Sequence, residues 1–339
     1  MARYLVTGGC GFIGSHLTDA LIEKGHKVVI LDNLSTGKIE NAHPKALVIT
    51  GDTTDYATVE RIIHNNIDGC FHLAAVASVE KSVIDWAKTH TVNLTSTVNV
   101  FQAASRCSTK VPVVYTSSAA VYGDCLVSPI PEEAEKSPLT AYGADKLGCD
   151  LHGRIAWHVH GVPNIGLRPF NVYGPRQDPS SPYSGVISIF TNRIKRWLAV
   201  TIHGDGEQVR DFVYVTDAVK GFMAAMDHLH EAGRITGHTS INLCTGHSAS
   251  INQLANAIAR ISGQPLQCNH AEARKGDIRV SIGDPTRLAS LLNLRLDTML
   301  EEGLEKLLGY TDLHAIANKP INNKEITTTR KMLIVPKAA

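Results

Sequence analysis

The sequence predicts an α/β protein in which a doubly wound parallel sheet is followed by a smaller, loop-rich C-terminal lobe. Along the first half, short β-rich runs alternate with stretches whose apolar residues recur every three or four positions, as in strands joined by crossover helices. After Arg168 this rhythm ends, because prolines and a glycine crowd together at Pro169, Gly174, Pro175, Pro179 and Pro182. Such a segment predicts loops and the start of a second lobe.

The strand candidates of the first half are short apolar runs bounded by turn residues. They lie at Tyr4–Thr7, Val28–Leu31, Leu47–Ile49, Cys70–Leu73, Val111–Tyr115 and Asn164–Arg168. The helical spacing predicts crossover helices at Phe12–Lys24, roughly Trp86–Ser105 and Tyr142–His160. Later, the chain is expected to return to the sheet and complete the lobe through a strand at Ser240–Cys244 and helices at Ile251–Ile261 and around Leu300–Leu308.

The length of 339 residues exceeds what one minimal core needs, so two unequal lobes are expected. We assign residues 1–170 to the sheet domain, to which the chain returns around residues 210–245. Residues 171–209 and 246–339 then form the second lobe. The tail from Asn318 onward has weak periodicity and is expected to be poorly ordered.

Charge and composition exclude several classes of protein. With 33 basic and 32 acidic residues, the formal net charge of +1 gives no field that would gather nucleic acid or an anionic membrane. The apolar stretches are only strand-length and the N-terminus has no signal-peptide profile, so we expect a cytosolic protein. Seven cysteines without a Cys-x-x-Cys spacing predict neither a disulfide nor zinc. The pairs His158/His160 and His228/His230 are two apart, so on a helix they diverge, and we predict no metal site.

A glycine-rich segment, Thr7-Gly8-Gly9-Cys10-Gly11-Phe12-Ile13-Gly14, follows an apolar strand and opens an amphipathic helix. This context is that of a Rossmann dinucleotide site, in which glycines permit a tight turn and a diphosphate lies at the helix N-terminus. Gly9, Gly11 and Gly14 have the general spacing, and Gly8, Gly11 and Gly14 have the wider spacing of short-chain dehydrogenases. Alone, the motif is also compatible with a strand–helix turn that binds nothing.

Asp32 favours the dinucleotide interpretation, because it ends the second strand about 20 residues after the motif. A carboxylate there can accept hydrogen bonds from the adenosine ribose and repel a 2′-phosphate, so NAD is predicted rather than NADP. Asp52, after the third strand, is expected near the adenine. Leu73-Ala74-Ala75, after the fourth strand, leaves room for the dinucleotide.

Tyr142 and Lys146 are four residues apart on a predicted helix, so their side chains share a face. A phenol with an intrinsic pKa of about 10 is a poor base at neutral pH unless a cation stabilises the phenolate, and Lys146 supplies that cation. The spacing alone is common by chance. Its position, after a strand that ends in Thr116-Ser117-Ser118, makes it specific.

Over about residues 3 to 310, these features together resemble the nucleotide-sugar branch of the extended short-chain dehydrogenases/reductases. The resemblance is carried by the glycine segment, Asp32, Ser118, Val121-Tyr122-Gly123, Tyr142/Lys146 and Arg168-Pro169-Phe170-Asn171-Val172-Tyr173-Gly174. It implies that a tyrosinate, Tyr142, takes a proton from a sugar hydroxyl while the sugar carbon passes a hydride to tightly bound NAD. Lys146 and Ser118 match the residues that assist it.

By the same resemblance, the cofactor is expected to contact Gly8, Gly11, Phe12, Ile13, Gly14, Asp32, Asn33, Ser35, Thr36, Gly37, Asp52, Thr53, Leu73, Ala74, Ala75, Asn93, Thr116, Tyr142, Lys146 and Phe170. The substrate is expected to contact Ser78, Ser118, Tyr142, Asn171, Val186, Arg210, Phe212, Arg274, Asp277 and Ser281. Arg210 and Arg274 suit a diphosphate because a guanidinium binds phosphate oxygens in a two-pronged geometry. Each arginine taken alone is equally compatible with a solvated surface position.

The residues after Ser118 narrow the reaction. Dehydratases of this branch carry an Asp-Glu pair there and decarboxylases a nearby glutamate, whereas this chain has Ala119 and Ala120, whose methyl groups cannot transfer protons. The sequence therefore resembles a UDP-hexose 4-epimerase that works through a 4-keto intermediate. Alternatives are a 4-epimerase of UDP-glucose/UDP-galactose or of a uronic acid or pentose derivative, another nucleotide-sugar dehydratase or decarboxylase, and a non-catalytic NAD-binding sensor.

Two further expectations follow from the resemblance. Epimerases restricted to glucose and galactose carry a tyrosine where this chain has Ser281, so a small residue here leaves space for an N-acetyl group. UDP-N-acetylglucosamine/UDP-N-acetylgalactosamine is the predicted pair, unless Ser281 merely lies on the surface. The helices near Trp86–Ser105 and Tyr142–His160 match those that pair in a four-helix interface, which predicts a homodimer.

Overall fold

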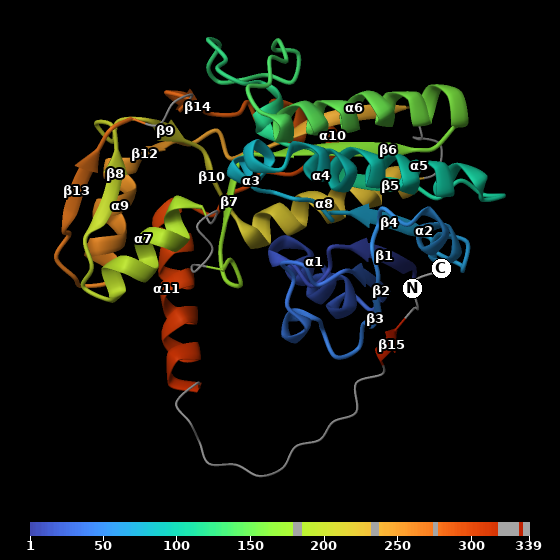
Figure 1. The fold of residues 1–339 in the computed structure, drawn as a ribbon, viewed down its shortest axis with the longest axis horizontal. Coiled ribbons are helices and arrows are strands. Elements are labelled where there is room, and N and C mark those ends of the chain that lie inside the picture. Colours follow the sequence, from blue (N-terminus) through green and yellow to red (C-terminus); the bar gives the residue numbers. More distant parts are fainter. Residues whose placement is uncertain (179–184, 232–236, 274–276, 318–331, 335–339) are drawn as a thin grey trace.

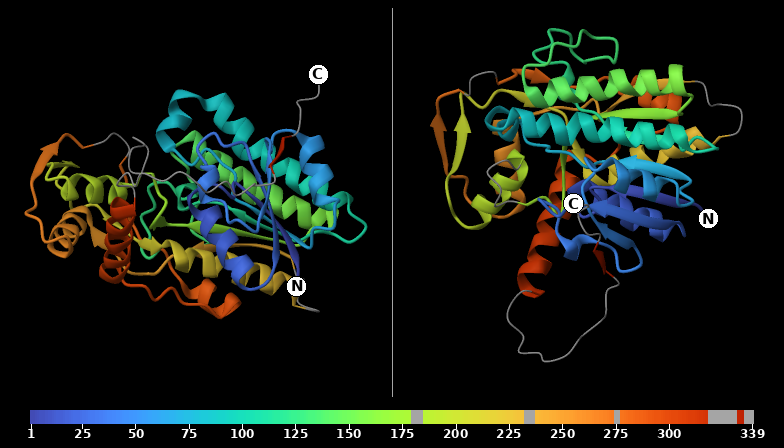
Figure 2. Two further views of the ribbon diagram at one scale, coloured as in Figure 1. Left: turned by 90° about the horizontal axis from the view of Figure 1, so that it is seen from below. Right: turned by 45° about the vertical axis from the view of Figure 1, so that its right-hand side comes forward.

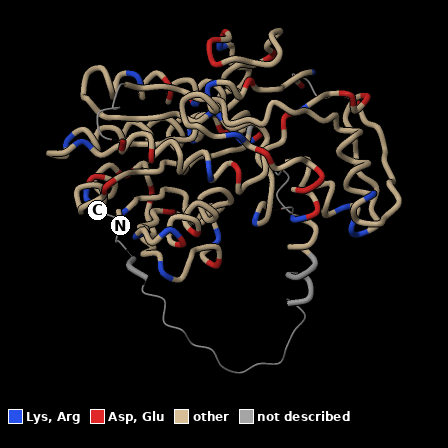
Figure 3. The backbone as a smooth tube through the Cα atoms, turned by 180° about the vertical axis from the view of Figure 1, so that it is seen from behind, with Lys and Arg blue, Asp and Glu red and all other residues tan. Residues whose placement is uncertain are grey.

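The computed structural model describes residues 1–178, 185–231, 237–273, 277–317 and 332–334. Its larger part is an eight-stranded parallel sheet with helices on both faces, and a smaller lobe lies at one end (Figure 1). Within the described residues, no helix is long and apolar enough to cross a membrane. Figure 3 shows acidic and basic positions interspersed along the chain.

The sheet has the strand order β11-β6-β5-β4-β1-β2-β3-β15. Its strands are β1 (Arg3–Thr7), β2 (Lys27–Asp32), β3 (Leu47–Thr50), β4 (Gly69–His72), β5 (Val113–Thr116), β6 (Asn164–Pro169), β11 (His238–Leu243) and β15 (Met332–Ile334). The order reverses between β1 and β4, where Thr7 is opposite His72. Ligands of open α/β sheets bind at the carboxyl ends of strands flanking such a reversal. The predicted parallel doubly wound sheet is confirmed.

Alternate residues of each strand enter two separate cores. Tyr4 and Val6 of β1 face one core, which also takes residues of α1 (Phe12–Glu23) and α8 (Val215–His230). Leu5, between them, faces the other core, beneath α2 (Tyr56–Ile63), α5 (Ser96–Arg106) and α6 (Ala141–His160). A strand buried on both faces reads as a continuous apolar run, which is why these strands were predictable. Figure 2 shows the two helical layers on either side of the sheet.

The helix predicted over about Trp86–Ser105 is not a single α-helix. It consists of α4 (Trp86–His90), a π-helical turn at Thr91–Thr95 and α5, and α3 (Val79–Ile84) precedes it. Both the interruption and α3 were missed, so the prediction was wrong in this detail. Between Ser118 and the catalytic helix α6, a 3-10 turn forms at Ala119–Val121.

The smaller lobe is built from short strands and four helices within the described residues. Its strands are β7 (Asn171–Tyr173), β8 (Val200–His203), β9 (Val209–Arg210), β10 (Phe212–Tyr214), β12 (Ala249–Ser250), β13 (Cys268–Ala271) and β14 (Val280–Ser281). Its helices are α7 (Val186–Lys195), α9 (Ile251–Ile261), α10 (Thr286–Leu292) and α11 (Leu300–Ala317). α7, α9 and α11 enclose a third apolar core, and α10 packs on α8 and β11.

Helix α9 has the predicted bounds because its ends are encoded locally. Ser250 and Gln253 form a capping box, in which each side chain accepts a hydrogen bond from the other residue's backbone N–H. The helix predicted around Leu300–Leu308 is longer, since α11 continues to Ala317. Apart from β15, the tail that we expected to be poorly ordered lies outside the described residues.

Candidate active site

The glycine turn lies between β1 and α1, at the strand-order reversal. Gly8 has a left-handed backbone, with φ +70, and a Cβ atom there would lie 2.9 Å from the backbone nitrogen of Ala74. A Cβ atom on Gly14 would lie 2.2 Å from the carbonyl oxygen of Gly8. The chain therefore comes closer to itself than any side chain would allow. The N-terminus of α1, next to this turn, fits the diphosphate of a dinucleotide.

Asp32 ends β2 and is buried against the glycine turn. One carboxylate oxygen accepts a hydrogen bond from the backbone N–H of Cys10 at 2.9 Å, and the other accepts one from Leu34 at 2.8 Å. Burial raises the pKa of Asp32, and the two backbone hydrogen bonds oppose that shift. Because a carboxylate has about four acceptor positions, Asp32 retains capacity for ribose hydroxyls.

The loop after Asp32 is tied to the end of β3. The Asn33 side chain donates to Asp52 at 2.9 Å, and its own carbonyl accepts the backbone N–H of Ser35 at 3.0 Å. The carbonyl of Thr53 accepts a hydrogen bond from Asn99 of α5 at 3.1 Å. Thr36 and Gly37 continue the same loop. The structure thus brings the predicted adenosine residues of two strands together.

A buried histidine that sequence reasoning missed organises the β1/β4 reversal. The Thr7 hydroxyl accepts hydrogen bonds from the backbone N–H groups of Leu73 and Ala74, at 3.1 and 3.2 Å. Both of its lone pairs are then used, so it donates its proton to Nδ1 of His72, 2.8 Å away. His72 must carry its own proton on Nε2. Burial, followed by the charge of Lys146, lowers its pKa to about 3, so the ring is neutral at physiological pH.

The π-helical turn completes this polar chain. Nε2 of His72 lies 3.2 Å from the Thr97 hydroxyl, which donates to the carbonyl of Asn93 at 2.7 Å. The Asn93 side chain accepts the backbone N–H of Val76 at 2.7 Å and donates back to its carbonyl at 3.2 Å. Asn93 thereby holds the loop that carries Ala74 and Ala75. Because this role depends on long-range contacts, the sequence shows no sign of it.

Tyr142 and Lys146 lie in the first turns of α6, which Thr140 caps by accepting the Gly143 N–H at 3.1 Å. The Lys146 ammonium donates to the carbonyl of Thr116 at 2.7 Å and lies 5.9 Å from the centre of the Tyr142 ring. Lys146 is only 3% exposed. A buried cation next to a phenol stabilises its ionised form.

Ser118 reaches the same place from the end of β5. Its hydroxyl accepts the backbone N–H of Ala120 at 3.1 Å, and Ala119 and Ala120 form the turn against which α6 packs. A Cβ atom on Gly143 would lie 2.6 Å from the Ala120 carbonyl, which shows how close this packing is. The structure therefore brings Ser118, Tyr142 and Lys146 to one edge of the sheet, where the carboxyl ends of its strands lie.

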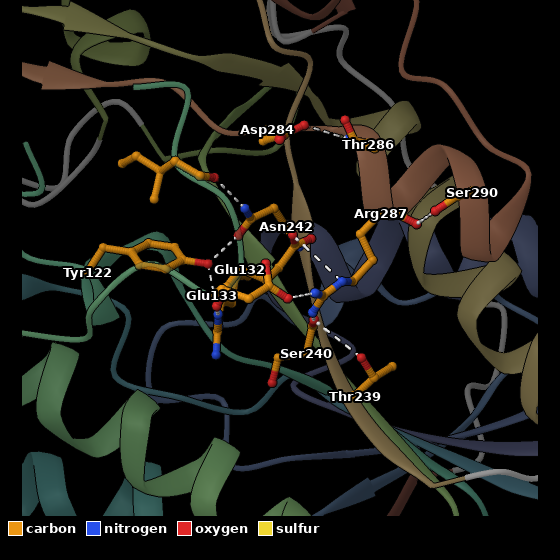
Figure 4. A network of polar contacts seen from close by, with 12 residues as sticks. Tyr122, Glu132, Glu133, Thr239, Ser240, Asn242, Asp284, Thr286, Arg287 and Ser290 are labelled. Atoms are coloured by element: carbon orange, nitrogen blue, oxygen red, sulfur yellow. Dashed lines mark hydrogen bonds and ion pairs between the residues drawn. The ribbon is translucent and has the colours of Figure 1, made fainter. Parts of the chain in front are cut away.

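The loop between Ser118 and Tyr142 is anchored by a buried polar network that sequence analysis missed (Figure 4). The Tyr122 hydroxyl donates to Asn242 of β11 at 2.7 Å, and the Asn242 backbone N–H donates to Glu132 at 2.9 Å. Arg168 of β6 donates to the Tyr122 hydroxyl at 2.7 Å and pairs with Asp150 of α6 at 2.9 Å. Burial raises the pKa of Tyr122 to about 12, although Arg168 opposes this.

The predicted substrate residues meet where β7, β9, β10 and β14 run together. The backbone N–H and side chain of Asn171 both donate to the carbonyl of Asp211, at 3.0 and 3.2 Å. Arg210 pairs with Asp277 at 2.6 Å, and Ser281 is opposite Arg210 in the β9/β14 register. Arg274 lies outside the described residues.

Three other predicted residues have local roles in the structure. The Ser78 hydroxyl caps α3 by accepting the Lys81 N–H at 3.1 Å, and Val186 is the first residue of α7. Phe170 is buried, and its backbone N–H donates to Leu243 at 3.1 Å. These positions leave their predicted ligand contacts as predictions.

Phe212 differs from its predicted neighbours. Its ring is 6% exposed, packs 6.4 Å from the ring of Tyr173, and lines a groove of about 610 Å3 with Thr245, His247 and Leu300. Neither Arg210 nor Asp277 lines this groove. That Phe212 lies beside the uracil therefore stays a prediction. Among the described residues, no group of three or more His, Cys, Asp or Glu side chains is arranged to hold a metal ion.

Comparison with known proteins gives consistent matches along most of the chain. The sequence model described as "NAD dependent epimerase/dehydratase family" matches residues 4–243. A UDP-glucose 4-epimerase of Mycolicibacterium smegmatis is 34% identical over 313 residues, which are 91% of this chain and 98% of that protein.

Two solved structures are similar in both sequence and fold. A UDP-glucose 4-epimerase from Thermotoga maritima, solved with UDP-glucose, is 36% identical with a TM-score of 0.87, and the match covers 92% of this chain and 99% of that one. A UDP-N-acetylglucosamine 4-epimerase from Methanobrevibacter ruminantium, solved with UDP-N-acetylmuramic acid, is 35% identical with a TM-score of 0.86 and the same coverage.

Proposed function

Because this chain belongs to the NAD dependent epimerase/dehydratase family, we propose that it interconverts UDP-N-acetylglucosamine and UDP-N-acetylgalactosamine by inverting the sugar at C4. It is an NAD-dependent enzyme of the UDP-sugar 4-epimerase kind. The observation that carries the reaction type is the pairing of Lys146 with Tyr142 beside a turn that offers only the methyl groups of Ala119 and Ala120. A base is present there, but the turn holds no further acid for elimination or decarboxylation.

The side chains of the site have separate tasks in this proposal. NAD, when bound, accepts a hydride from C4 of the sugar and later returns it. Tyr142 takes the proton of the 4-hydroxyl group and gives it back, while Lys146 stabilises the intervening phenolate. The Ser118 hydroxyl donates a hydrogen bond to the same sugar oxygen. The 4-keto intermediate turns about its diphosphate between the two hydride transfers.

Binding is concentrated at the nucleotide end so that the hexose remains free to turn. Arg210, which is buried and already oriented by Asp277, supplies donors for the diphosphate. Asn171 lies next to it across the β7/β10 pair. Such a division of labour needs firm contacts with UDP and few with the sugar ring.

The N-acetyl preference rests on Ser281. Its small side chain is half-buried in the β14 strand, directly across from Arg210, so a bulky residue is absent from this position. The related UDP-N-acetylglucosamine 4-epimerase is compatible with this choice. The UDP-glucose/UDP-galactose pair is the second candidate, because several relatives carry the name UDP-glucose 4-epimerase.

A direct assay tests the proposal. Purified protein is incubated with UDP-N-acetylglucosamine or UDP-glucose in separate reactions, and the products are resolved by chromatography and NMR. We expect the galacto epimer of the N-acetyl sugar to form faster than that of glucose at equal substrate concentration. Faster conversion of UDP-glucose would favour the second candidate. A protein that binds NAD but converts neither would be the sensor that the sequence left open.

We also propose that two copies associate through α3, α4 and α6. Leu151, Ile155 and Val159 are exposed at four-residue intervals and form one apolar stripe on α6. Val83, Ile84 and Trp86, on or next to α3 and α4, which pack against α6, are exposed as well. Large exposed apolar patches mark interaction surfaces. A self-complementary contact of these helices would bury both patches.

A further inference from the structure

The segment Pro175–Asp178, which we call the latch, leaves the substrate lobe and lies against α1 of the sheet domain. Nε2 of His16 donates to the carbonyl of Pro175 at 3.0 Å. One turn farther along α1, Asp19 pairs with Arg176 at 2.7 Å. At the other end of the latch, Asp178 pairs with Lys38 at 3.4 Å. The latch therefore bridges the two lobes at three points.

The latch holds an unfavourable backbone conformation. Arg176 has φ +66, a left-handed conformation that costs free energy in any residue with a side chain. Such a conformation persists only where surrounding contacts determine it. The Asp19 ion pair and the His16 hydrogen bond are those contacts on one side. On the other side, Gln177 accepts a hydrogen bond from Ser188 of α7 at 2.6 Å.

The two ion pairs of the latch differ in their shielding from water. The Arg176 and Asp19 side chains are 24% and 22% exposed, whereas Lys38 and Asp178 are 51% and 39% exposed. Exposed pairs contribute little to stability, so the Arg176–Asp19 pair is the stronger of the two. Burial lowers the pKa of His16, so its ring is neutral at physiological pH and donates through Nε2.

The points where the latch is attached are the elements that form the cofactor site. His16 and Asp19 lie on α1, which begins at the glycine turn. The backbone N–H of Lys38 donates to Cys10 within that turn at 3.0 Å, and Lys38 follows Gly37, which packs under Asp32. The latch itself continues from β7, where Asn171 lies. It thus spans from the proposed substrate strand to the diphosphate and ribose sites.

Arg176 also has a donor that the protein does not use. Its Nη1 atom is buried and has no hydrogen-bond partner among the described residues. A buried donor without a partner costs free energy, and an anion bound beside it would remove that cost. The diphosphate of a dinucleotide is an anion of this class.

We propose that the latch retains the dinucleotide, and that the Arg176–Asp19 pair must open before the cofactor leaves. This inference rests on the proposed function, because an enzyme that oxidises and then reduces the same sugar must keep one cofactor through both steps. The latch closes over α1 and the ribose loop, and opening it relaxes the strained backbone of Arg176. Release of the cofactor is then limited by the opening of a contact between the lobes.

The test measures dissociation of the reduced dinucleotide rather than turnover. The protein is loaded with NADH, excess NAD is added, and the loss of bound NADH fluorescence gives the dissociation rate. We expect Asp19→Asn, which keeps Arg176 but removes its ion pair, to raise this rate about tenfold. Arg176→Ala should raise it at least as much. The charge-swapped variant Asp19→Arg/Arg176→Asp should return the rate toward that of the wild type.

A matched control is Arg279→Ala, which breaks an exposed ion pair with Asp205 in the small lobe and should leave the rate unchanged. Thermal unfolding of each cofactor-free variant checks that it is folded. Dissociation rates within twofold of the wild type for both single variants would overturn the latch. Failure of the proposed function is a separate outcome, in which wild-type protein binds NADH but converts no UDP-sugar.

Discussion

The ammonium group of Lys146 lies 2.7 Å from the carbonyl oxygen of Thr116, the last residue of β5. This hydrogen bond fixes a buried cation at the carboxyl end of a central strand, between the sheet and the Tyr142 ring. The strand therefore positions the lysine, and helix α6 positions the phenol relative to it. Two elements of the sheet domain thus determine where a proton can be taken from the substrate.

Replacing Tyr142 with phenylalanine removes the proposed base and keeps the ring beside Lys146. We expect turnover to fall by about 100-fold or more, the usual loss when a general base is removed. The amount of NAD that copurifies should not change, because the ring is kept. The measurement is a steady-state epimerase assay combined with release and quantification of bound dinucleotide. A variant that retains a tenth of the wild-type rate would require another base.

Acid should destabilise the protein through His72. Its pKa of about 3 in the folded state lies below the 6.5 of an unperturbed histidine, chiefly because the ring is buried. Between these values the unfolded chain binds more protons, so the free energy of unfolding falls as the pH drops from about 6.5 toward 3. At pH 5 this amounts to about 2 kcal/mol.

Urea unfolding of the cofactor-free protein at pH 7 and pH 5 measures this loss. His72→Asn lacks the titrating group, so its stability should depend less on pH over this range, even if it is less stable at pH 7. Equal pH dependence of the two proteins would show that His72 is not the group that titrates.

The parts of the fold that the sequence predicted are those with local signals. The glycine turn required Gly8 and Gly14 because of backbone contacts within eight residues of chain, and the ends of α9 follow from the Ser250–Gln253 capping box. Tyr142 and Lys146 could be paired because helical spacing alone places them on one face. These features need no knowledge of the tertiary structure.

The features that were missed depend on residues far apart in the chain. Glu132 meets Asn242 across 110 positions, and His72 meets Thr7 across 65. No periodicity or spacing motif records such contacts. The π-helical turn was missed for a related reason, because Asn93 of that turn bonds with the Val76 backbone only after both segments have packed on the sheet.

The proposed dimer predicts that a charge on the apolar stripe of α6 yields monomers. Ile155→Glu would bury an unpaired carboxylate at the centre of the interface, which is strongly unfavourable. Light scattering after gel filtration measures the mass. Leu198→Glu is a matched control, because Leu198 is similarly exposed on the small lobe and its substitution should leave the dimer intact. A monomeric wild type would contradict the proposed interface.

The N-acetyl preference predicts a selective effect at Ser281. Ser281→Tyr should lower kcat/KM for UDP-N-acetylglucosamine about 10- to 100-fold, because overfilling a packed site typically costs about 1–3 kcal/mol. UDP-glucose, which lacks the N-acetyl group, should be converted at nearly the wild-type rate. Ser281→Ala is the control and should retain both activities. Equal losses for both sugars would mean that Ser281 does not face the C2 substituent.

The last prediction concerns Asp32, whose carboxylate already holds the backbone N–H groups of Cys10 and Leu34. If it also accepts hydrogen bonds from the adenosine ribose, Asp32→Ala should weaken NAD binding by about 1.5–3 kcal/mol, the scale of a hydrogen bond to a charged group. This corresponds to a loss of roughly 10- to 100-fold in affinity. Removing the negative charge should also ease the repulsion of a 2′-phosphate, so the preference for NAD over NADP should narrow.

Asp32→Asn separates these two effects, since it keeps the size of the side chain and removes its charge. It should narrow the NAD/NADP ratio as Asp32→Ala does, while one carbonyl acceptor remains for the glycine turn. Titration of the cofactor-free variants with each dinucleotide gives both quantities. If NAD affinity fell but the NAD/NADP ratio stayed constant, Asp32 would be acting only through the backbone of Cys10 and Leu34, because loosening the turn weakens both dinucleotides alike.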